Sequence, residues 1–186
     1  HVSGTNVARR DDPSPATARG VLLGIKAGLK QVFGTDSLAG RSVAIQGLGH
    51  VGYYLAHYLT EAGAEVFGSD INVDNLARAT NNLAITAVPP HEILLHRCDV
   101  LAPCAMGAIL DKNSIGNLQT SIIAGAANNQ LATEEDDGRL KARNIVYCPD
   151  FAINAGGIVD IHHQQQNASK NIRAEAIERI AQNVRV

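Results

Sequence analysis

Three glycines follow an apolar stretch of the chain at a spacing that suits a phosphate-binding turn. Residues 42–46 (SVAIQ) have the character of a strand, and the next six residues, GLGHVG, place Gly47, Gly49 and Gly52 in a G-x-G-x-x-G pattern. The first glycine permits a tight turn, the second leaves the backbone open to a pyrophosphate, and the third lets the following helix lie close to the sheet. Free N–H groups at the start of that helix would face the phosphates. The pattern therefore predicts a dinucleotide site.

An acidic residue ends the next strand expected along the chain. Residues 64–69 (AEVFGS) form this strand, and Asp70 follows it directly. A carboxylate at this position accepts hydrogen bonds from the ribose hydroxyls of the adenosine and repels a 2′-phosphate. Since residues 71–73 (INV) include no arginine, we interpret the site as one for NAD rather than NADP.

Alternating strands and helices surround the glycine pattern. Apolar spacing and turn residues predict helices over about 15–33, 50–62, 75–81 and 133–143, with single helical turns within 91–96 and 109–118. Further strands are expected over 84–88, 99–102, 121–126 and 144–148. Such alternation predicts an α/β fold: a doubly wound, mostly parallel sheet of the Rossmann type with helices on both faces.

No linker or repeat divides the 186 residues. We expect an irregular segment over 1–11, an NAD-binding Rossmann-like domain over 12–170, and a C-terminal helix over 171–186 with an apolar face. Because the chain opens on His1 rather than Met, we interpret it as a piece of a longer protein, with the helix leading toward a missing catalytic domain.

Composition narrows the range of partners. The formal net charge of −2 and the pI near 6.4 give no basic footprint, so neither nucleic acid nor a membrane surface is expected as a partner. The three cysteines form no CxxC pair and have no histidine at ligand spacing, so we expect free thiols in a reducing, cytoplasmic compartment. The adjacent histidines at 162–163 point apart on a helix, and no metal site is expected.

Three other segments are dense in small, hydroxyl and amide residues and adjoin the ends of expected elements. They are 13–18 (PSPATA), 124–130 (AGAANNQ) and 149–157 (PDFAINAGG). Each by itself is typical of a turn, since Asn and Gly are common turn residues. The carboxyl edge of an open α/β sheet is also where ligands bind, so together with the glycine pattern these segments favour a site for a carboxamide and ribose hydroxyls.

Six motifs in order cover nearly all of residues 12–163: DPSPATARGVLLGIKAG, VAIQGLGHVG, SDIN, CDVLAPCAMGAIL, IIAGAANNQL and YCPDFAINAGGIVD. Together they resemble the cofactor-binding domain of the glutamate/leucine/phenylalanine/valine dehydrogenase family, nearest to its leucine dehydrogenase branch. The resemblance implies reversible oxidative deamination, in which an L-amino acid becomes a 2-oxo acid and ammonium while hydride passes to NAD.

The resemblance also implies roles on the adenosine side of the cofactor. Gly47, Gly49, His50 and Val51 would hold the pyrophosphate, and Asp70 would bind the adenosine ribose. Ala102 ends the expected strand over 99–102. This residue and the next two, Pro103 and Cys104, would border the crevice between the adenosine and the nicotinamide.

On the nicotinamide side, Thr17 would hold the carboxamide and Asn128 the ribose, according to the same resemblance. Asn154 would lie nearest the reacting amino acid, with Ile158 and Ile161 lining the pocket for its side chain. An apolar lining of this kind implies a branched aliphatic substrate.

The catalytic groups of the family do not appear in the chain. The resemblance implies a lysine base of lowered pKa in a glycine-rich segment and a partner aspartate, both from another domain, and neither motif occurs here. We therefore expect no catalytic residue in this chain, which would bind NAD without turnover. The whole protein is expected to take an amino-acid substrate and to form a homo-oligomer.

Two other functions remain open at this point. A stand-alone NAD(H)-sensing regulatory module would need only the glycine pattern and Asp70. A dehydrogenase acting on small hydroxy acids or cyclic substrates would need a catalytic His or Lys near the nicotinamide, and the motifs place none there.

Overall fold

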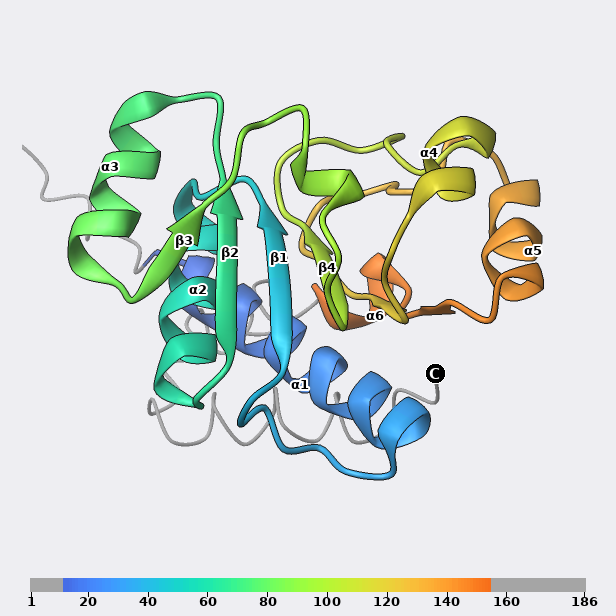
Figure 1. The fold of residues 1–186 in the computed structure, drawn as a ribbon, viewed down its shortest axis with the longest axis horizontal. Helices are drawn as coiled ribbons and strands as arrows, with labels where there is room; N and C mark the ends of the chain where they lie inside the picture. Colours follow the sequence, from blue (N-terminus) through green and yellow to red (C-terminus); the bar gives the residue numbers. More distant parts are fainter. Residues whose placement is uncertain (1–11, 155–186) are drawn as a thin grey trace, which may run out of the picture.

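Six parallel strands form one sheet in residues 12–154, the part of the chain that the computed structural model describes (Figure 1). The strands lie in the order β3-β2-β1-β4-β5-β6, and every pairing between neighbours is parallel. Their bounds are β1 (Ser42–Gln46), β2 (Glu65–Ser69), β3 (Ile85–Ala87), β4 (Val100–Pro103), β5 (Ile122–Ile123) and β6 (Val146–Tyr147). This is the strand order of a dinucleotide-binding sheet, and it confirms the predicted fold class.

Helices cover both faces of the sheet, as β1 shows. Val43 and Ile45 belong to one buried cluster with side chains of α1 (Ser14–Phe33) and α2 (His50–Glu61). Ala44 points the opposite way, into a second buried cluster. The second cluster contains side chains of three further elements, η1 (Ile93–Leu95), α4 (Lys112–Asn117) and α5 (Glu135–Ala142). The remaining helices are α3 (Val73–Asn82) and α6 (Asp150–Ile153).

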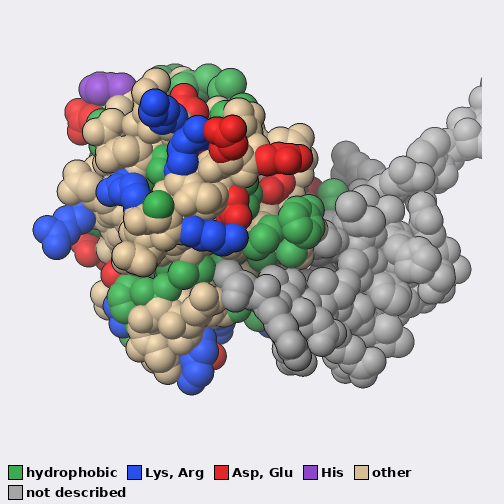
Figure 2. Space-filling view, turned by 90° about the vertical axis from the view of Figure 1, so that its right-hand side faces the viewer, with side chains coloured by type: hydrophobic (Ala, Val, Ile, Leu, Met, Phe, Trp, Pro, Cys, Tyr) green, Lys and Arg blue, Asp and Glu red, His purple; other side chains and the backbone are tan. Residues whose placement is uncertain are grey.

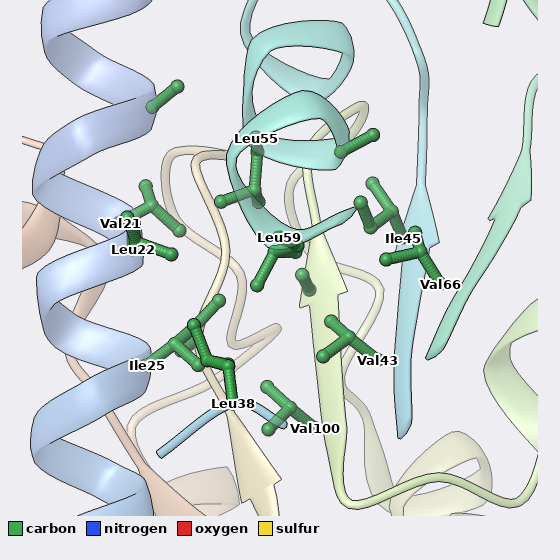
Figure 3. Packing of buried hydrophobic residues seen from close by; sticks show 14 of the residues in the cluster. Val21, Leu22, Ile25, Leu38, Val43, Ile45, Leu55, Leu59, Val66 and Val100 are labelled. Carbon is green, nitrogen blue, oxygen red and sulfur yellow. The ribbon is translucent and has the colours of Figure 1, made fainter. Parts of the chain in front are cut away.

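The α1–α2 layer fixes the place where the glycine loop must lie. Ile25 of α1 and Leu55 and Leu59 of α2 are fully buried against β1, around Val43 and Ile45 (Figure 3). Full burial of an aliphatic side chain contributes about 1.5–3 kcal/mol, so this layer is a large part of the core. It holds the first turn of α2 directly above the carboxyl end of β1.

The structure differs from the sequence predictions mainly beyond β4. A short helix, α6, begins where a loop was expected, and residues 109–118 contain the six-residue helix α4. The last two strands are shorter than predicted, with two residues each. Asn144, the expected start of the last strand, has a φ of 56° and ends α5 instead, because a residue in the left-handed region cannot extend a strand.

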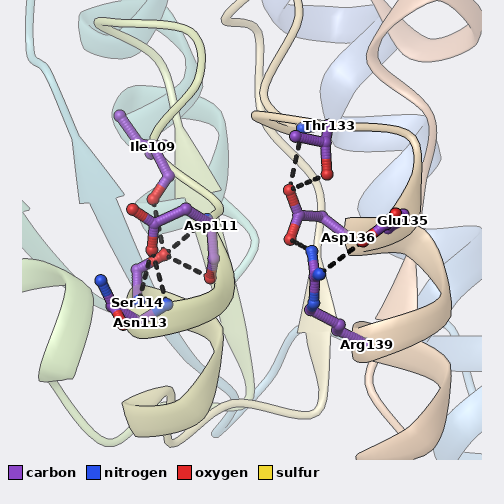
Figure 4. A network of polar contacts seen from close by, with 8 residues as sticks. All are labelled: Ile109, Asp111, Asn113, Ser114, Thr133, Glu135, Asp136 and Arg139. Atoms are coloured by element: carbon purple, nitrogen blue, oxygen red, sulfur yellow. Dashed lines mark hydrogen bonds and ion pairs between the residues drawn. The ribbon is translucent and has the colours of Figure 1, made fainter.

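Two carboxylates fix the starts of α4 and α5 (Figure 4). Asp111 accepts hydrogen bonds from the backbone N–H groups of Asn113 (2.8 Å) and Ser114 (2.7 Å), which is a capping box. Asp136 is fully buried and accepts from the Thr133 N–H (2.8 Å) and from Arg139 (2.6 Å). Burial by itself raises the pKa of the Asp136 carboxyl, but the hydrogen bonds from Arg139 and Thr133 outweigh it and hold that pKa below its ordinary value.

Replacing Asp136 with asparagine is expected to lower the free energy of unfolding at neutral pH, since Arg139 loses its carboxylate partner. The pKa of Asp136 is lower in the folded state, so its contribution is complete above the unfolded pKa and is lost as the pH falls through the folded pKa. Urea unfolding of the parent and of Asp136→Asn at pH 7, 5 and 3 should therefore show a difference in the free energy of unfolding that becomes smaller as the pH falls.

The matched control is Asp137→Asn, because Asp137 is partly exposed and pairs with the exposed Lys141 at 2.6 Å. This substitution should change the free energy of unfolding by no more than about 0.5 kcal/mol. If the difference in free energy of unfolding between the parent and Asp136→Asn stayed constant across the pH range, the role assigned to the charge of Asp136 would be wrong.

Charges of both signs alternate on the face of the molecule seen in Figure 2. Lys and Arg side chains lie among Asp and Glu side chains there, so this face carries no patch of one sign. Within residues 12–154, no helix combines the length and the apolar character that a membrane span requires.

Candidate functional site

The glycine loop lies between β1 and α2, and Gly47 and Gly52 each have a conformational or steric reason to be glycine. Gly47 has a φ of 94°, a conformation that side chains other than hydrogen disfavour. A Cβ on Gly52 would lie 1.9 Å from the Gly47 carbonyl oxygen, so only glycine lets α2 start this close to β1. A Cβ on Gly49 would meet no atom of residues 12–154 within 4 Å, so these residues leave the backbone surface open at the middle of the loop.

The first turn of α2 has the properties of an anion site. Gly49 precedes the helix and no side chain caps its N-terminus, so the first N–H groups, including those of His50 and Val51, are not satisfied by a cap. The His50 side chain is exposed. A helix start with open N–H groups and an adjacent bare backbone fits two phosphate groups in charge and in space.

Asp70 lies at the carboxyl end of β2 and faces the loop itself. One carboxylate oxygen accepts from the Leu48 N–H (2.8 Å) and from the Asn75 amide (3.3 Å), and the other accepts from the Asn72 N–H (2.8 Å). An ionised carboxylate has about four lone-pair sites, so it can accept further hydrogen bonds from a ribose. The sequence placed Asp70 beside the loop but did not reveal that it binds the loop backbone.

Arg78 of α3 is a residue of this site that the sequence predictions missed. Its guanidinium lies 3.1 Å from the Leu48 carbonyl oxygen and 3.2 Å from the Gly49 carbonyl oxygen. Arg78 lies beyond residues 71–73, in the second turn of α3. Its spacing from Asp70 is visible in the sequence, but its contacts with the loop are not.

The end of β4 borders the glycine loop. Ala102 and Pro103 are buried, and the N–H of Cys104 donates to the Gln46 carbonyl at the end of β1 (2.7 Å). Burial raises the pKa of the Cys104 thiol to about 11, so it is a neutral thiol and a poor nucleophile near pH 7. Among the described residues, Cys98, Cys104 and Cys148 are all free thiols.

Two predicted amide residues come together at the carboxyl edge of the sheet. The amide nitrogen of Asn154 lies 2.7 Å from the side-chain oxygen of Asn128, which joins the segments that follow β5 and β6. Asp150 supports the same loop: it accepts from the Asn129 N–H (2.8 Å) and from the Tyr147 hydroxyl (2.7 Å). The Tyr147 and Asp150 contacts were not predicted.

Thr17 lies in the first turn of α1, where its hydroxyl donates to the Pro13 carbonyl (3.2 Å). α1 packs against α2, the helix that follows the glycine loop, and hydrogen bonds from Ser14 hold the pKa of Asp12, just before α1, below its ordinary value. Within residues 12–154, no hydrogen bond joins Thr17 to the amide pair. Ile158, Ile161 and the helix expected over 171–186 lie outside the described residues.

The lysines of the described residues lie away from the candidate site. Lysines occur at positions 26 and 30 of α1, 112 of α4 and 141 of α5, and none of these lies in the loops at the carboxyl edge of the sheet. No group of three or more His, Cys, Asp or Glu side chains gathers within 12–154 as a metal site would require. The edge can therefore hold phosphates, hydroxyls and amides.

Comparison with known proteins shows the family to which the chain belongs. The model of the glutamate/leucine/phenylalanine/valine dehydrogenase family matches residues 11–71 and 68–184. The chain belongs to this family.

Individual relatives in the family act on different amino acids, according to their names. Leucine dehydrogenase of Geobacillus stearothermophilus is 41% identical over 173 residues, covering 93% of this chain and 47% of the relative. Phenylalanine dehydrogenase of Bacillus thermotolerans is 41% identical over 165 residues, covering 86% of this chain and 43% of the relative. The crystal structure of L-tryptophan dehydrogenase from Nostoc punctiforme has a TM-score of 0.89 at 38% identity, covering 92% of this chain and 52% of that one.

The chain thus spans about half the length of the relatives it matches. Because the leucine and phenylalanine dehydrogenases described above are both 41% identical to the chain, overall identity does not distinguish the branch of the family.

Proposed function

We propose that this chain is the NAD-binding domain of an amino-acid dehydrogenase that converts a branched-chain L-amino acid reversibly to its 2-oxo acid. The observation that carries the proposal is the glycine loop in a member of this family. Its middle glycine leaves open space, its third glycine lies where a Cβ would be 1.9 Å from the Gly47 carbonyl oxygen, and no side chain caps the start of α2. This open backbone surface fits a pyrophosphate, and a side chain at position 49 would block it.

In this proposal the N–H groups of Gly49, His50 and Val51 hold the pyrophosphate, and Asp70 accepts from the adenosine ribose. Bound NAD supplies the nicotinamide ring that accepts hydride. Thr17 binds the carboxamide of that ring. The negative charge of Asp70 supports NAD over NADP, since a 2′-phosphate at the same ribose would be repelled.

The paired amides belong to the nicotinamide side. Asn128 donates its amide to the nicotinamide ribose while its oxygen is held by Asn154 at 2.7 Å. The Asn154 side chain lies nearest the reacting amino acid. Beside β4, the crevice is bordered by Ala102, Pro103 and Cys104. The branched-chain preference rests on the apolar pocket that the resemblance implies for Ile158 and Ile161.

The base that removes the proton from the amino acid comes, in this proposal, from another domain of the whole protein. The whole protein is a cytoplasmic homo-oligomer. Membership of the dehydrogenase family favours this function over an NAD(H)-sensing module.

The test is a titration of the folded chain with NADH, followed by the coenzyme fluorescence, together with an assay of leucine oxidation. We expect saturable NADH binding, NADPH binding at least about tenfold weaker, which corresponds to about 1.4 kcal/mol, and no turnover. The whole protein should oxidise leucine and valine faster than phenylalanine. No saturable NADH binding, or leucine turnover by the chain alone, would contradict the proposal.

A further inference from the structure

Leu48 in the glycine loop is held from two sides by charged residues outside the loop. Its N–H donates to the Asp70 carboxylate at 2.8 Å, and its carbonyl oxygen accepts from Arg78 at 3.1 Å. The same Arg78 nitrogen lies 3.2 Å from the Gly49 carbonyl oxygen. One guanidinium therefore holds two successive carbonyl groups of the loop.

Arg78 itself is fixed by two neighbouring elements. It lies in the second turn of α3, whose start is capped by the Asn72 side chain through the N–H groups of Asp74 and Asn75. Its guanidinium carbon lies 4.3 Å from the centre of the Tyr53 ring on α2. Stacking on an aromatic face contributes about 0.5–1 kcal/mol at an exposed site and keeps the planar group in one orientation. Arg78 thus links α3, the loop and α2.

The geometry of the peptide bond relates these two carbonyl groups to the N–H groups at the proposed pyrophosphate site. A trans peptide unit is planar, so its C=O and its N–H point in opposite directions. The Leu48 carbonyl shares a peptide unit with the Gly49 N–H, and the Gly49 carbonyl shares one with the His50 N–H. By holding both carbonyls on the α3 side, Arg78 turns the Gly49 and His50 N–H groups toward the opposite side, where the loop is open.

We propose that Arg78 is a positioning residue that presets the glycine loop for the pyrophosphate of the dinucleotide, an inference that rests on the proposed function. Without Arg78 the Leu48–Gly49 peptide unit loses its carbonyl partner and can rotate, and binding then has to order it, whereas the Gly49–His50 unit keeps the hydrogen bond from the Tyr53 N–H to the Gly49 carbonyl (3.1 Å). Ordering a rotating peptide unit costs conformational entropy, which is the source of the expected loss in affinity.

The experiment compares the full chain with Arg78→Ala, Arg78→Lys and a control, Arg97→Ala. Arg97 is also exposed, but it precedes β4, at the opposite edge of the sheet from the glycine loop. Amide hydrogen exchange is measured without ligand, and NADH affinity is measured by titration. For Arg78→Ala we expect exchange at Leu48, whose N–H is hydrogen-bonded to Asp70, to accelerate about tenfold and the Kd for NADH to rise about tenfold. Arg78→Lys should restore part of both effects, and Arg97→Ala should change neither.

Each other outcome has a defined meaning. Unchanged exchange in Arg78→Ala would overturn the positioning role even if the Kd rose, because that combination indicates direct contact with the ligand. Faster exchange with an unchanged Kd would overturn the link to the pyrophosphate. If the unsubstituted chain bound no NADH, the proposed function would fail, and with it the pyrophosphate role, whatever the exchange data showed.

Discussion

Replacing Gly52 with alanine should destabilise the fold by about 3 kcal/mol or more and abolish NADH binding. The added Cβ would lie 1.9 Å from the oxygen and 2.9 Å from the carbon of the Gly47 carbonyl, which are backbone atoms that cannot rotate away. Relief requires α2 to move off the end of β1, which opens the packing of Leu55 and Leu59 on the sheet. Urea unfolding and NADH titration measure the two effects.

The matched control is Gly138→Ala in α5. A Cβ there would meet no atom within 4 Å, and alanine is favoured over glycine inside a helix by about 1 kcal/mol. Gly138→Ala should therefore be neutral or stabilising. A stability of Gly52→Ala within about 0.5 kcal/mol of the parent would show that the close contact between loop and helix is not required.

Gly49→Ala is expected to have the opposite profile: a fold of nearly unchanged stability that has lost most of its affinity for NADH. In the absence of ligand the new Cβ would meet no atom within 4 Å. In the proposed complex it would occupy the surface where the pyrophosphate approaches, and a steric cost of about 1–3 kcal/mol raises the Kd roughly tenfold to a hundredfold. The measurements are thermal unfolding and NADH fluorescence titration.

The comparison of Gly49→Ala with Gly52→Ala separates binding from folding within a single loop. Should Gly49→Ala bind NADH as tightly as the parent, the pyrophosphate would have to lie elsewhere, and the roles proposed for the loop N–H groups would be wrong.

The first half of the fold was predictable because its signals are local. The strand at 42–46, the glycine turn and the helix after it are encoded by neighbouring residues, and the structure has β1 and α2 where the pattern placed them. Asn128 and Asn154 could be assigned to one edge because both follow predicted parallel strands. Their direct contact at 2.7 Å agrees with that assignment.

What the sequence missed depends on contacts between distant elements. Arg78 has the pattern of an ordinary surface residue on a helix, and its role appears only when α3 lies beside the glycine loop. Asp150 accepts a hydrogen bond from the Asn129 N–H, 21 residues earlier in the chain. Sequence periodicity does not predict contacts at this separation. The two-residue strands β5 and β6 are held by their neighbours in the sheet, since so short a segment has too little local preference to define its own ends.

The double attachment of Asp70 has a consequence for attempts to redesign coenzyme preference. Exchanging this acid for a small or basic residue is an obvious way to admit a 2′-phosphate, but the exchange also removes the acceptor of the Leu48 and Asn72 N–H groups. A variant that only removes the charge would lose the hydrogen bond that holds the Leu48 N–H and would bind both coenzymes poorly. A successful redesign has to provide a replacement acceptor for Leu48 along with the new phosphate contact, so selectivity and loop architecture must be engineered together.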